Sequence, residues 1–314
     1  MQTGIEIALG AVAANGATIG IQPSCIAVFG GPLTPAAKHS STLPPLPPLS
    51  LRDAFVRWLQ EERPDLSKKL LLPESFEDWN NFDTYPDLLA FEEDLGYVTS
   101  VVVIFLEAPG SIAELGSFSQ IPSLRDQLVV VTFDSRHPKK SFISLGPLRQ
   151  IENRDSQSVC VIPDRGVSGF IKDVDVLMEA VSSKMASPRG GRRFEPDDKK
   201  QQFLLALDVI TLLEIATISD IKKWFIHFLV DVLDGRVKQI LFTLEKANLI
   251  QIKRYGGYVF YLPVQRGMAW MEHTGALPER PFNRARVGAK IATARDPKSA
   301  ISKAFDLVYG GGEK

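Results

Sequence analysis

Five short apolar runs mark the first 165 residues, and none of them alternates hydrophobic and polar positions. Such runs are typical of strands that are buried on both faces of a parallel sheet. Between them, apolar residues recur at helical spacing over 50–62, 85–96 and 174–185, and a further helix is expected to open at Ser111. The alternation predicts an α/β fold whose N-terminal domain is a three-layer sandwich around a parallel sheet. The expected strands cover residues 25–29, 69–74, 101–106, 127–133 and 158–162.

The pattern changes after a stretch of proline, glycine and charged residues. Three helical segments follow, at 202–215, 218–225 and 234–248, and two apolar strands over 249–262 flank a Gly256-Gly257 turn. Three helices and a hairpin in this order predict a winged helix-turn-helix. We therefore expect a catalytic α/β domain over 1–186, a linker over 187–199, a winged-helix domain over 200–272 and a basic tail over 273–314.

Charge is distributed unevenly between the two halves, although the formal net charge is only −1. Residues 184–314 hold 22 Lys and Arg against 14 Asp and Glu, whereas residues 1–183 hold 14 against 23. The basic half suggests an anionic partner such as nucleic acid. Winged helices also serve as protein contacts, and the tail is either a phosphate-neutralising arm or a solvated end. The residues expected to face nucleic acid are Arg236, Gln239, Thr243 and Lys246 on the third helix and Lys253 and Arg254 on the wing.

Glu114 is the candidate catalytic carboxylate. The strand over 101–106 stops near Pro109-Gly110, so that Ser111 begins a helix and Glu114 lies in its first turn. Open α/β sheets bind ligands at the carboxyl ends of their strands, and the helix N-terminus favours an ionised carboxylate. Ser111 and Glu114 also fit a capping box, in which case Glu114 is only structural.

Other polar or flexible positions follow the strands. Gly30-Gly31 comes after the first strand, and Glu74 after the second, where it is either a site residue or a surface carboxylate. The loops Gly30-Gly31 and Pro109-Gly110-Ser111 are expected to hold ribose and phosphate through backbone N–H groups. Glu107 and Glu74 are candidates for positioning water or ribose hydroxyls. The polar segment 136–147 is a candidate lid that supplies cations.

Several classes of site are not expected. Cys25 and Cys160 lie in apolar runs and suit buried positions in a reducing compartment rather than a disulfide, and the four histidines are scattered, so no metal site is predicted. Residues 1–22 lack the pattern of a signal peptide or membrane span, which indicates a cytoplasmic protein without membrane contact. The proline-rich run 42–49 is either a stiff spacer or a polyproline ligand.

The motifs of 107–118, together with Lys140–Ile143 and Gly146–Arg149, resemble the effector of retron anti-phage systems that joins a nucleoside 2-deoxyribosyltransferase-like domain to a C-terminal winged helix. The resemblance implies that Glu114 attacks the anomeric carbon of an N-glycoside. The family's usual aspartate falls on Ala108, beside Glu107, which favours hydrolysis of the nicotinamide bond of NAD over exchange of bases. NAD is then a substrate, and no cofactor is implied. The implied partners are a retron reverse transcriptase and its multicopy DNA–RNA hybrid, which restrain the toxin, and a second copy of the chain.

Two alternatives remain at this point. The first keeps the enzyme but changes its substrate, to nucleosides or other nucleotides, by deoxyribosyl transfer or glycosidic cleavage. The second is a winged-helix transcriptional regulator whose α/β domain senses a nucleotide without catalysis, with Ser111 and Glu114 as a capping box. Turnover of a glycoside distinguishes the two.

Overall fold

The computed structural model describes residues 2–35, 46–76, 84–136, 140–186, 190–231 and 233–310. The chain divides into two compact units, which we treat separately. The sheet unit comprises Ser24–Glu77 and Leu95–Ser187. The C-terminal unit comprises Met1–Pro23, Asp78–Asp94 and Pro188–Lys314.

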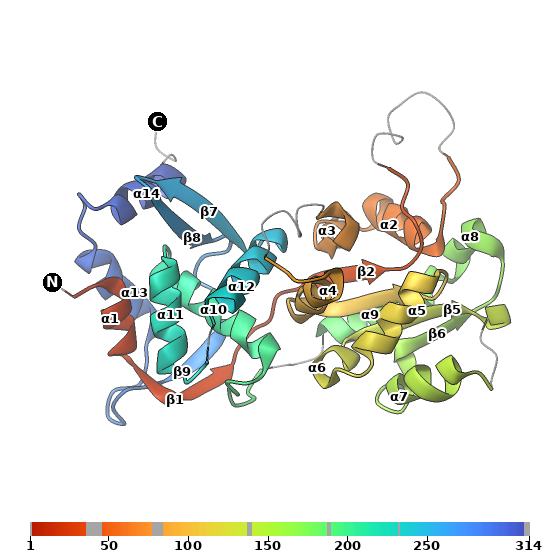
Figure 1. The fold of residues 1–314 in the computed structure, drawn as a ribbon, viewed down its shortest axis with the longest axis horizontal. Coiled ribbons are helices and arrows are strands. Elements are labelled where there is room, and N and C mark those ends of the chain that lie inside the picture. Colours follow the sequence, from red (N-terminus) through yellow and green to blue (C-terminus); the bar gives the residue numbers. More distant parts are fainter. Residues whose placement is uncertain are drawn as a thin grey trace. The chain divides into compact units, whose positions relative to one another are not determined.

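The sheet unit is built on five parallel strands in the order β3-β2-β4-β5-β6 (Figure 1). The predicted α/β fold with a parallel sheet is confirmed, and each predicted strand is found, with β3 shorter than expected. Every residue of the three central strands β2, β4 and β5 is buried, which explains their unalternating sequences. The strands are β2 Cys25–Phe29, β3 Leu70–Leu71, β4 Thr99–Phe105, β5 Leu128–Phe133 and β6 Val159–Ile162.

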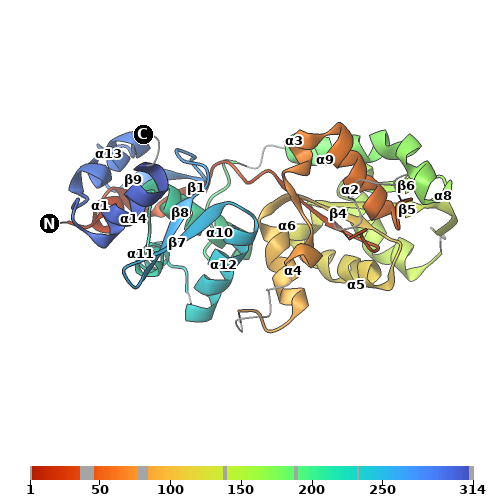
Figure 2. The same ribbon diagram turned by 90° about the horizontal axis from the view of Figure 1, so that it is seen from above.

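Helices cover both faces of this sheet. On one face, α2 and α9 pack through Phe55 and Leu177 onto alternate strand residues such as Val103. On the other face, Phe118 of α5 meets Phe29 edge to face, with ring centroids 5.2 Å apart. Figure 2 shows α2 and α9 along one side of the sheet and α5 and α6 along the other. The helices are α2 Leu51–Glu62, α3 Pro64–Ser67, α4 Leu88–Tyr97, α5 Pro109–Phe118, α6 Pro122–Arg125, α7 Arg149–Glu152, α8 Gly166–Gly169 and α9 Val174–Ala186.

The order of the strands creates a switch point beside β2. From β2 the chain moves to β3 on one side and then returns to β4 on the other side. In parallel sheets, ligands bind outside the carboxyl ends of the strands at such a point. The segments that follow β2, β3 and β4 therefore occupy the position where an active site is expected.

The C-terminal unit contains three helices and a hairpin close to their predicted positions. The β7–β8 hairpin turns through Gly256 and Gly257, whose φ angles of 57° and 79° suit glycine. Residues Ala304 and Phe305 of α14 pack on this hairpin, so the tail is folded rather than an extended arm. The elements are α10 Lys199–Leu213, α11 Ile218–His227, α12 Asp234–Lys246, β7 Ile250–Tyr255, β8 Tyr258–Pro263, β9 Met271–Gly275, α13 Arg284–Ala294 and α14 Ala300–Tyr309.

The N-terminal residues differ from the predicted domain boundaries. Residues 1–186 were expected to form one domain, yet α1 (Gly4–Leu9) and β1 (Val12–Ile19) belong to the C-terminal unit. The physical reason is pairing: β1 forms an antiparallel ladder with β9, which begins more than 250 residues later (Figure 1). Residues 84–94 also belong to that unit, and the boundary between the units falls within α4.

A buried carboxylate holds the C-terminal unit together. Asp208 of α10 is fully buried and accepts hydrogen bonds from the Met271 backbone N–H (3.1 Å) and from His273 Nε2 (2.7 Å), and it pairs with Arg284 of α13. These bonds join α10, β9 and α13. Substitution of one of these residues leaves the charged or polar groups of the others buried without their partner.

We expect Asp208→Asn to lower the stability of the C-terminal unit by about 3 kcal/mol or more, because a buried ion pair is broken from one side. Urea denaturation followed by tryptophan fluorescence measures this loss, since Trp224 and Trp270 are buried in that unit. Asp197→Asn, at an exposed position, serves as the control. Equal unfolding midpoints for the two variants would contradict the role given to Asp208.

Candidate functional site

The structure brings the predicted site residues of the sheet unit to one edge of the sheet. Gly30 follows β2, Glu74 lies in the 3-10 turn after β3, Glu107 follows β4, and Glu114 lies on α5. Three strands adjacent in the sheet thus deliver these residues at their carboxyl ends. The contacts among them define a candidate active site.

Glu107 is an anchor rather than a free carboxylate. Its Oε1 accepts hydrogen bonds from the backbone N–H groups of Gly31 and Arg52, both at 3.0 Å, and its Oε2 accepts one from Leu51 at 2.7 Å. Leu51 and Arg52 begin α2, where unpaired backbone N–H groups favour a carboxylate. Glu107 therefore fixes the Gly30-Gly31 turn and the start of α2, a role that differs from the predicted positioning of water.

Gly30 and Gly31 are required by close packing at this anchor. A Cβ atom on Gly30 would lie 2.9 Å from Cβ of Phe105, and its φ of 150° disfavours other residues. A Cβ atom on Gly31 would lie 2.7 Å from Cβ of Ser50. Because the Gly31 N–H donates to Glu107, it is engaged within the protein rather than free for a phosphate, contrary to the prediction.

Arg52 is the site residue that the sequence analysis missed. Its side chain is only 1% exposed, and its Nη1 and Nη2 atoms each lie 2.5 Å from an oxygen of Glu74. Glu74 itself has a side chain that is 62% exposed. Burial raises the pKa of Glu74, but hydrogen bonds and charge from Arg52 outweigh it and leave the pKa below its usual value. One feature of the sequence indicates that Arg52 lies near the site: it is a charged residue in the first turn of the helix that follows the Gly30-Gly31 turn.

Glu114 is half-buried, and its Oε2 is buried without a hydrogen-bond partner among the described residues. Burial raises its pKa to about 7; the charge of Arg52 opposes this shift and that of Glu74 adds to it. Desolvation therefore opposes the stabilisation of the ionised carboxylate that was expected from the helix N-terminus. A half-buried carboxylate with one unpartnered oxygen, within electrostatic range of a cation, suits a nucleophile more than a structural residue.

The helix that carries Glu114 begins earlier than predicted. Pro109 is the first residue of α5, so Gly110 and Ser111 lie in the first turn and Glu114 in the second. The Ser111 hydroxyl donates to the Ala108 carbonyl oxygen at 2.8 Å instead of capping the helix for Glu114. The capping box of Ser111 and Glu114 is thus absent, and that structural explanation of Glu114 is removed.

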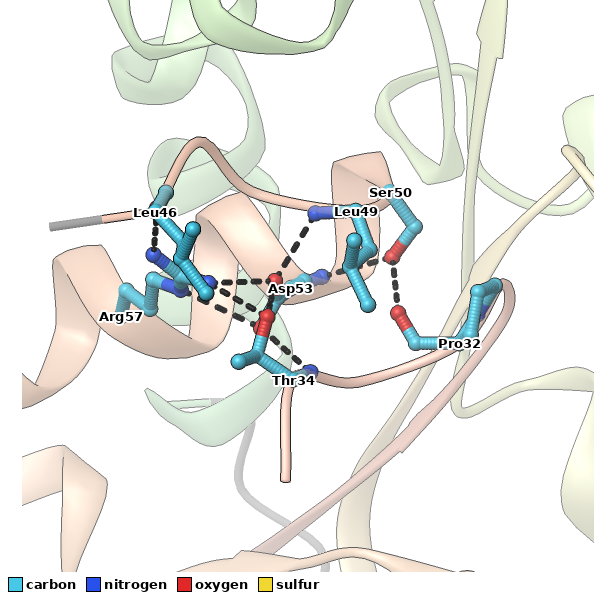
Figure 3. A network of polar contacts seen from close by, with 7 residues as sticks. All are labelled: Pro32, Thr34, Leu46, Leu49, Ser50, Asp53 and Arg57. Atoms are coloured by element: carbon cyan, nitrogen blue, oxygen red, sulfur yellow. Dashed lines mark hydrogen bonds and ion pairs between the residues drawn. The ribbon is translucent and has the colours of Figure 1, made fainter. Parts of the chain in front are cut away.

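A second network holds the loop between β2 and α2 (Figure 3). Asp53 accepts hydrogen bonds from Thr34 Oγ1 at 2.7 Å and from the Leu49 N–H at 2.9 Å, and it pairs with Arg57 at 2.9 Å. Ser50 caps α2: its Oγ accepts a hydrogen bond from the Asp53 N–H at 2.9 Å, and its hydroxyl donates to the Pro32 carbonyl oxygen. Both described ends of the loop are therefore fixed to the helix that carries Arg52. The part of the proline-rich run before residue 46, like residues 137–139 of the candidate lid, lies outside the described residues.

The nucleic-acid face predicted on α12 is largely occupied within the C-terminal unit. Arg236 pairs with Asp94, the Gln239 side chain donates to the Thr84 carbonyl oxygen at 3.0 Å, and Thr243 is fully buried against the Tyr85 hydroxyl. The prediction that Thr243 faces outward is wrong because residues 84–94 cover this side of the helix. Lys246 is half-buried, with its Nζ 5.0 Å from the centre of the Phe242 ring.

Other basic groups of this unit are exposed. Arg254 on the hairpin is exposed and Lys253 is half-buried. Arg280, Arg286 and Lys290 are exposed and line a cavity of about 470 Å³ beside α13, which Glu6 also lines. Arg295 is instead engaged: its guanidinium lies 4.2 Å from the centre of the Phe305 ring. The basic surface therefore lies on the hairpin and α13 more than on α12.

Neither a metal cluster nor a membrane span emerges from the described part of the chain. No three or more His, Cys, Asp or Glu side chains in the described ranges come together as metal ligands. None of the described helices is long and apolar enough to cross a bilayer.

Comparison with known proteins identifies relatives for part of the chain. Two proteins of Escherichia coli match, named "Retron Ec86 putative ribosyltransferase/DNA-binding protein" and "Retron Ec73 putative ribosyltransferase/DNA-binding protein". The first is 39% identical over 72 residues, 23% of this chain and 24% of the relative, and the second is 36% identical over 72 residues, 23% of each. The matched part thus spans about a quarter of the length of these relatives.

A family model covers more of the sequence. The model of the STM3845 retron effector protein matches residues 48–252, which include α2, the turn with Glu74, and α5. The match extends over well over half of the 314 residues. The chain therefore belongs to the family of STM3845 retron effector proteins.

Proposed function

We propose that the sheet unit cleaves the N-glycosidic bond between nicotinamide and ribose in NAD, with Glu114 as the nucleophile. The observation that carries this proposal is the half-buried Glu114 carboxylate at the carboxyl edge of the sheet, with one oxygen unpartnered among the described residues and within electrostatic range of Arg52. The word ribosyltransferase in the names of the relatives supports chemistry at an anomeric carbon. The sheet unit resembles nucleoside 2-deoxyribosyltransferases in its motif around Glu114.

The reaction proceeds in two steps. Glu114 attacks the anomeric carbon that bears nicotinamide, the C–N bond breaks, and its electron pair neutralises the positively charged ring nitrogen. Nicotinamide leaves without protonation, so this step requires no general acid. Water then attacks the same carbon, displaces the carboxylate and loses its proton to solvent, which gives ADP-ribose with retention of configuration.

The surrounding groups support substrate binding. The first turn of α5, with Gly110 and Ser111, presents backbone N–H groups toward a phosphate. Glu74 retains acceptor capacity for a hydroxyl or a water, whereas Glu107 is engaged by three backbone N–H groups. Other nucleotides and nucleosides are alternative substrates of the same site, and a product analysis over a panel of glycosides separates them from NAD.

We further propose that α10, α11, α12 and the β7–β8 hairpin form a winged helix that binds nucleic acid. The words DNA-binding in the names of the relatives support this assignment. The contacts of Arg236 and Gln239 within the unit shift the proposed surface to Lys253 and Arg254 on the hairpin and to the basic side of α13. In a retron, the partners we propose are the reverse transcriptase and its DNA–RNA hybrid, which restrain the toxic activity, and a second copy of the chain.

Glu114→Gln is expected to lower nicotinamide release from NAD by about a thousandfold or more, because an amide cannot form the glycosyl ester. Release is measured with the purified protein, alone and with its co-expressed reverse transcriptase complex. Glu179→Gln, at an exposed position of the same unit, is the control and should retain full activity. Near-wild-type release by Glu114→Gln would refute the nucleophile.

The rate should depend on pH through Glu114, whose pKa lies at about 7. A nucleophile acts in its ionised form, so kcat/KM should fall about tenfold per pH unit below that value and level off above it. The measurement is a pH profile of kcat/KM between pH 5 and 9. A flat profile between pH 5 and 8 would contradict the assignment.

Charge reversal at Lys253 and Arg254 should weaken binding to a DNA–RNA hybrid and reduce the slope of log K against log salt by up to about 2. A salt titration by fluorescence anisotropy measures both effects. The double variant Arg154→Glu/Lys172→Glu, exposed on the sheet unit, changes the net charge equally. Equal weakening by both pairs would show that only net charge matters and would remove the hairpin from the interface.

A further inference from the structure

The Arg52–Glu74 pair is costly for a purely structural contact. Arg52 is 1% exposed, so its guanidinium loses most of its hydration, while its partner Glu74 is 62% exposed at the surface. Removing a charge from water costs several kcal/mol, and an apolar side chain would fill the same space at less cost. The exposed end of the pair contributes little stability by itself. A function at the site explains why charged residues stand there.

Pairing with Arg52 orients the Glu74 carboxylate but occupies only part of its capacity to accept hydrogen bonds. Both oxygens of Glu74 accept one hydrogen bond each from the fork of Arg52, at 2.5 Å. A carboxylate has about four acceptor positions, so about two remain. Because both contacts come from one planar guanidinium, the plane of the Glu74 carboxylate is fixed.

The same pair lies within electrostatic range of the nucleophile. Both Arg52 and Glu74 act on the ionisation of Glu114, in opposite directions. Glu74 follows β3 and Glu114 lies on the helix after β4, and these two strands flank β2, so both residues lie at the same edge of the sheet. A group bound by Glu74 therefore lies on the side of the sheet where Glu114 attacks the anomeric carbon. A phosphate at this position would face the carboxylates of Glu74 and Glu114, whereas a neutral diol donates hydrogen bonds to a carboxylate, as ribose does in dinucleotide sites.

We propose that Glu74 binds the 2′- and 3′-hydroxyls of ribose and makes the site specific for ribosides over 2′-deoxyribosides. Arg52 is the positioning residue that orients the Glu74 carboxylate. This inference rests on the proposed function, since it names the sugar that the site accepts. A 2′-deoxy substrate loses one hydrogen bond to a charged acceptor, which corresponds to about a ten- to hundredfold lower kcat/KM. Because Glu74 contacts the sugar, this preference does not depend on which base leaves.

The experiment compares NAD with 2′-deoxy-NAD in the full-length protein. The wild type should prefer NAD by about ten- to a hundredfold. Glu74→Gln, an exposed position that is not needed for the core, should lower kcat/KM more for NAD than for 2′-deoxy-NAD, which keeps only the contact of its 3′-hydroxyl, so that the preference for NAD is lost or strongly reduced. Arg52→Lys keeps the charge but loses the fork, and it should reduce the preference in the same direction. The control is Arg63→Lys in the exposed Arg63–Asp65 pair of the same segment, which should keep the preference.

A pH profile separates positioning from mere structural support. Glu74 acts on Glu114 as a like charge, so Glu74→Gln should move the midpoint of the kcat/KM profile to lower pH. A variant that only loosened the structure would change the rate without this shift. An unchanged midpoint together with an unchanged preference for NAD in Glu74→Gln would overturn the inference while leaving the proposed function in place.

A binding measurement keeps the inference testable if no glycoside is turned over. Calorimetry compares ADP-ribose with 2′-deoxy-ADP-ribose in the wild type and in Glu74→Gln. A preference for ADP-ribose that Glu74→Gln removes would support the diol site even though the proposed cleavage had failed. Equal affinity of the wild type for both compounds, or a preference that survives in Glu74→Gln, would overturn it.

Discussion

The candidate site depends on the three backbone hydrogen bonds that the Glu107 carboxylate accepts. They join the end of β4 to the Gly30-Gly31 turn after β2 and to the first turn of α2. Because α2 is fixed at its N-terminus, Arg52 enters the interior beside the sheet and reaches Glu74, which follows β3. One half-buried acceptor thus sets the relative positions of three strand ends. Glu114, on the helix after β4, is then subject to the charges of Arg52 and Glu74, which hold each other in place.

Much of the sheet could be predicted from the sequence, because strands buried on both faces require continuous apolar runs such as Val101–Phe105. The polar groups were harder to place. Nothing in the local sequence shows that Arg52 turns inward, since its partner lies 22 residues away. Glu107 was recognised as a site residue, but its role was expected to be the positioning of water or ribose hydroxyls. Its three backbone N–H partners come together only in the tertiary fold, so the sequence does not show them. For Ser111 a signal existed: Pro109 is favoured at the first position of a helix, which moves Glu114 into the second turn.

The C-terminal unit shows a similar limit. The 3.6-residue spacing located α12 correctly, yet its polar side was assumed to be solvated. In the structure, Tyr85 packs edge to face with Phe91 and Phe242 and bonds to Asp94 and Thr243, so residues 84–94 cover that side. Pairing of β1 with β9 likewise depends on contacts that no short sequence window contains. The basic residues of the hairpin and α13 consequently replace those of α12 as the proposed surface for nucleic acid.

The central claim is that Glu114 forms a covalent bond with the sugar. The most direct measurement is mass spectrometry of the protein after reaction with an NAD analogue that carries fluorine in the arabino position at C2′, which slows hydrolysis of a glycosyl ester. The account predicts an adduct of one fluoro-sugar unit with its attached nucleotide, located on the peptide that contains Glu114 and absent from Glu114→Gln. An adduct on another residue would contradict it. Release of nicotinamide without any adduct, with inverted configuration at the anomeric carbon of the sugar product, would contradict it as well.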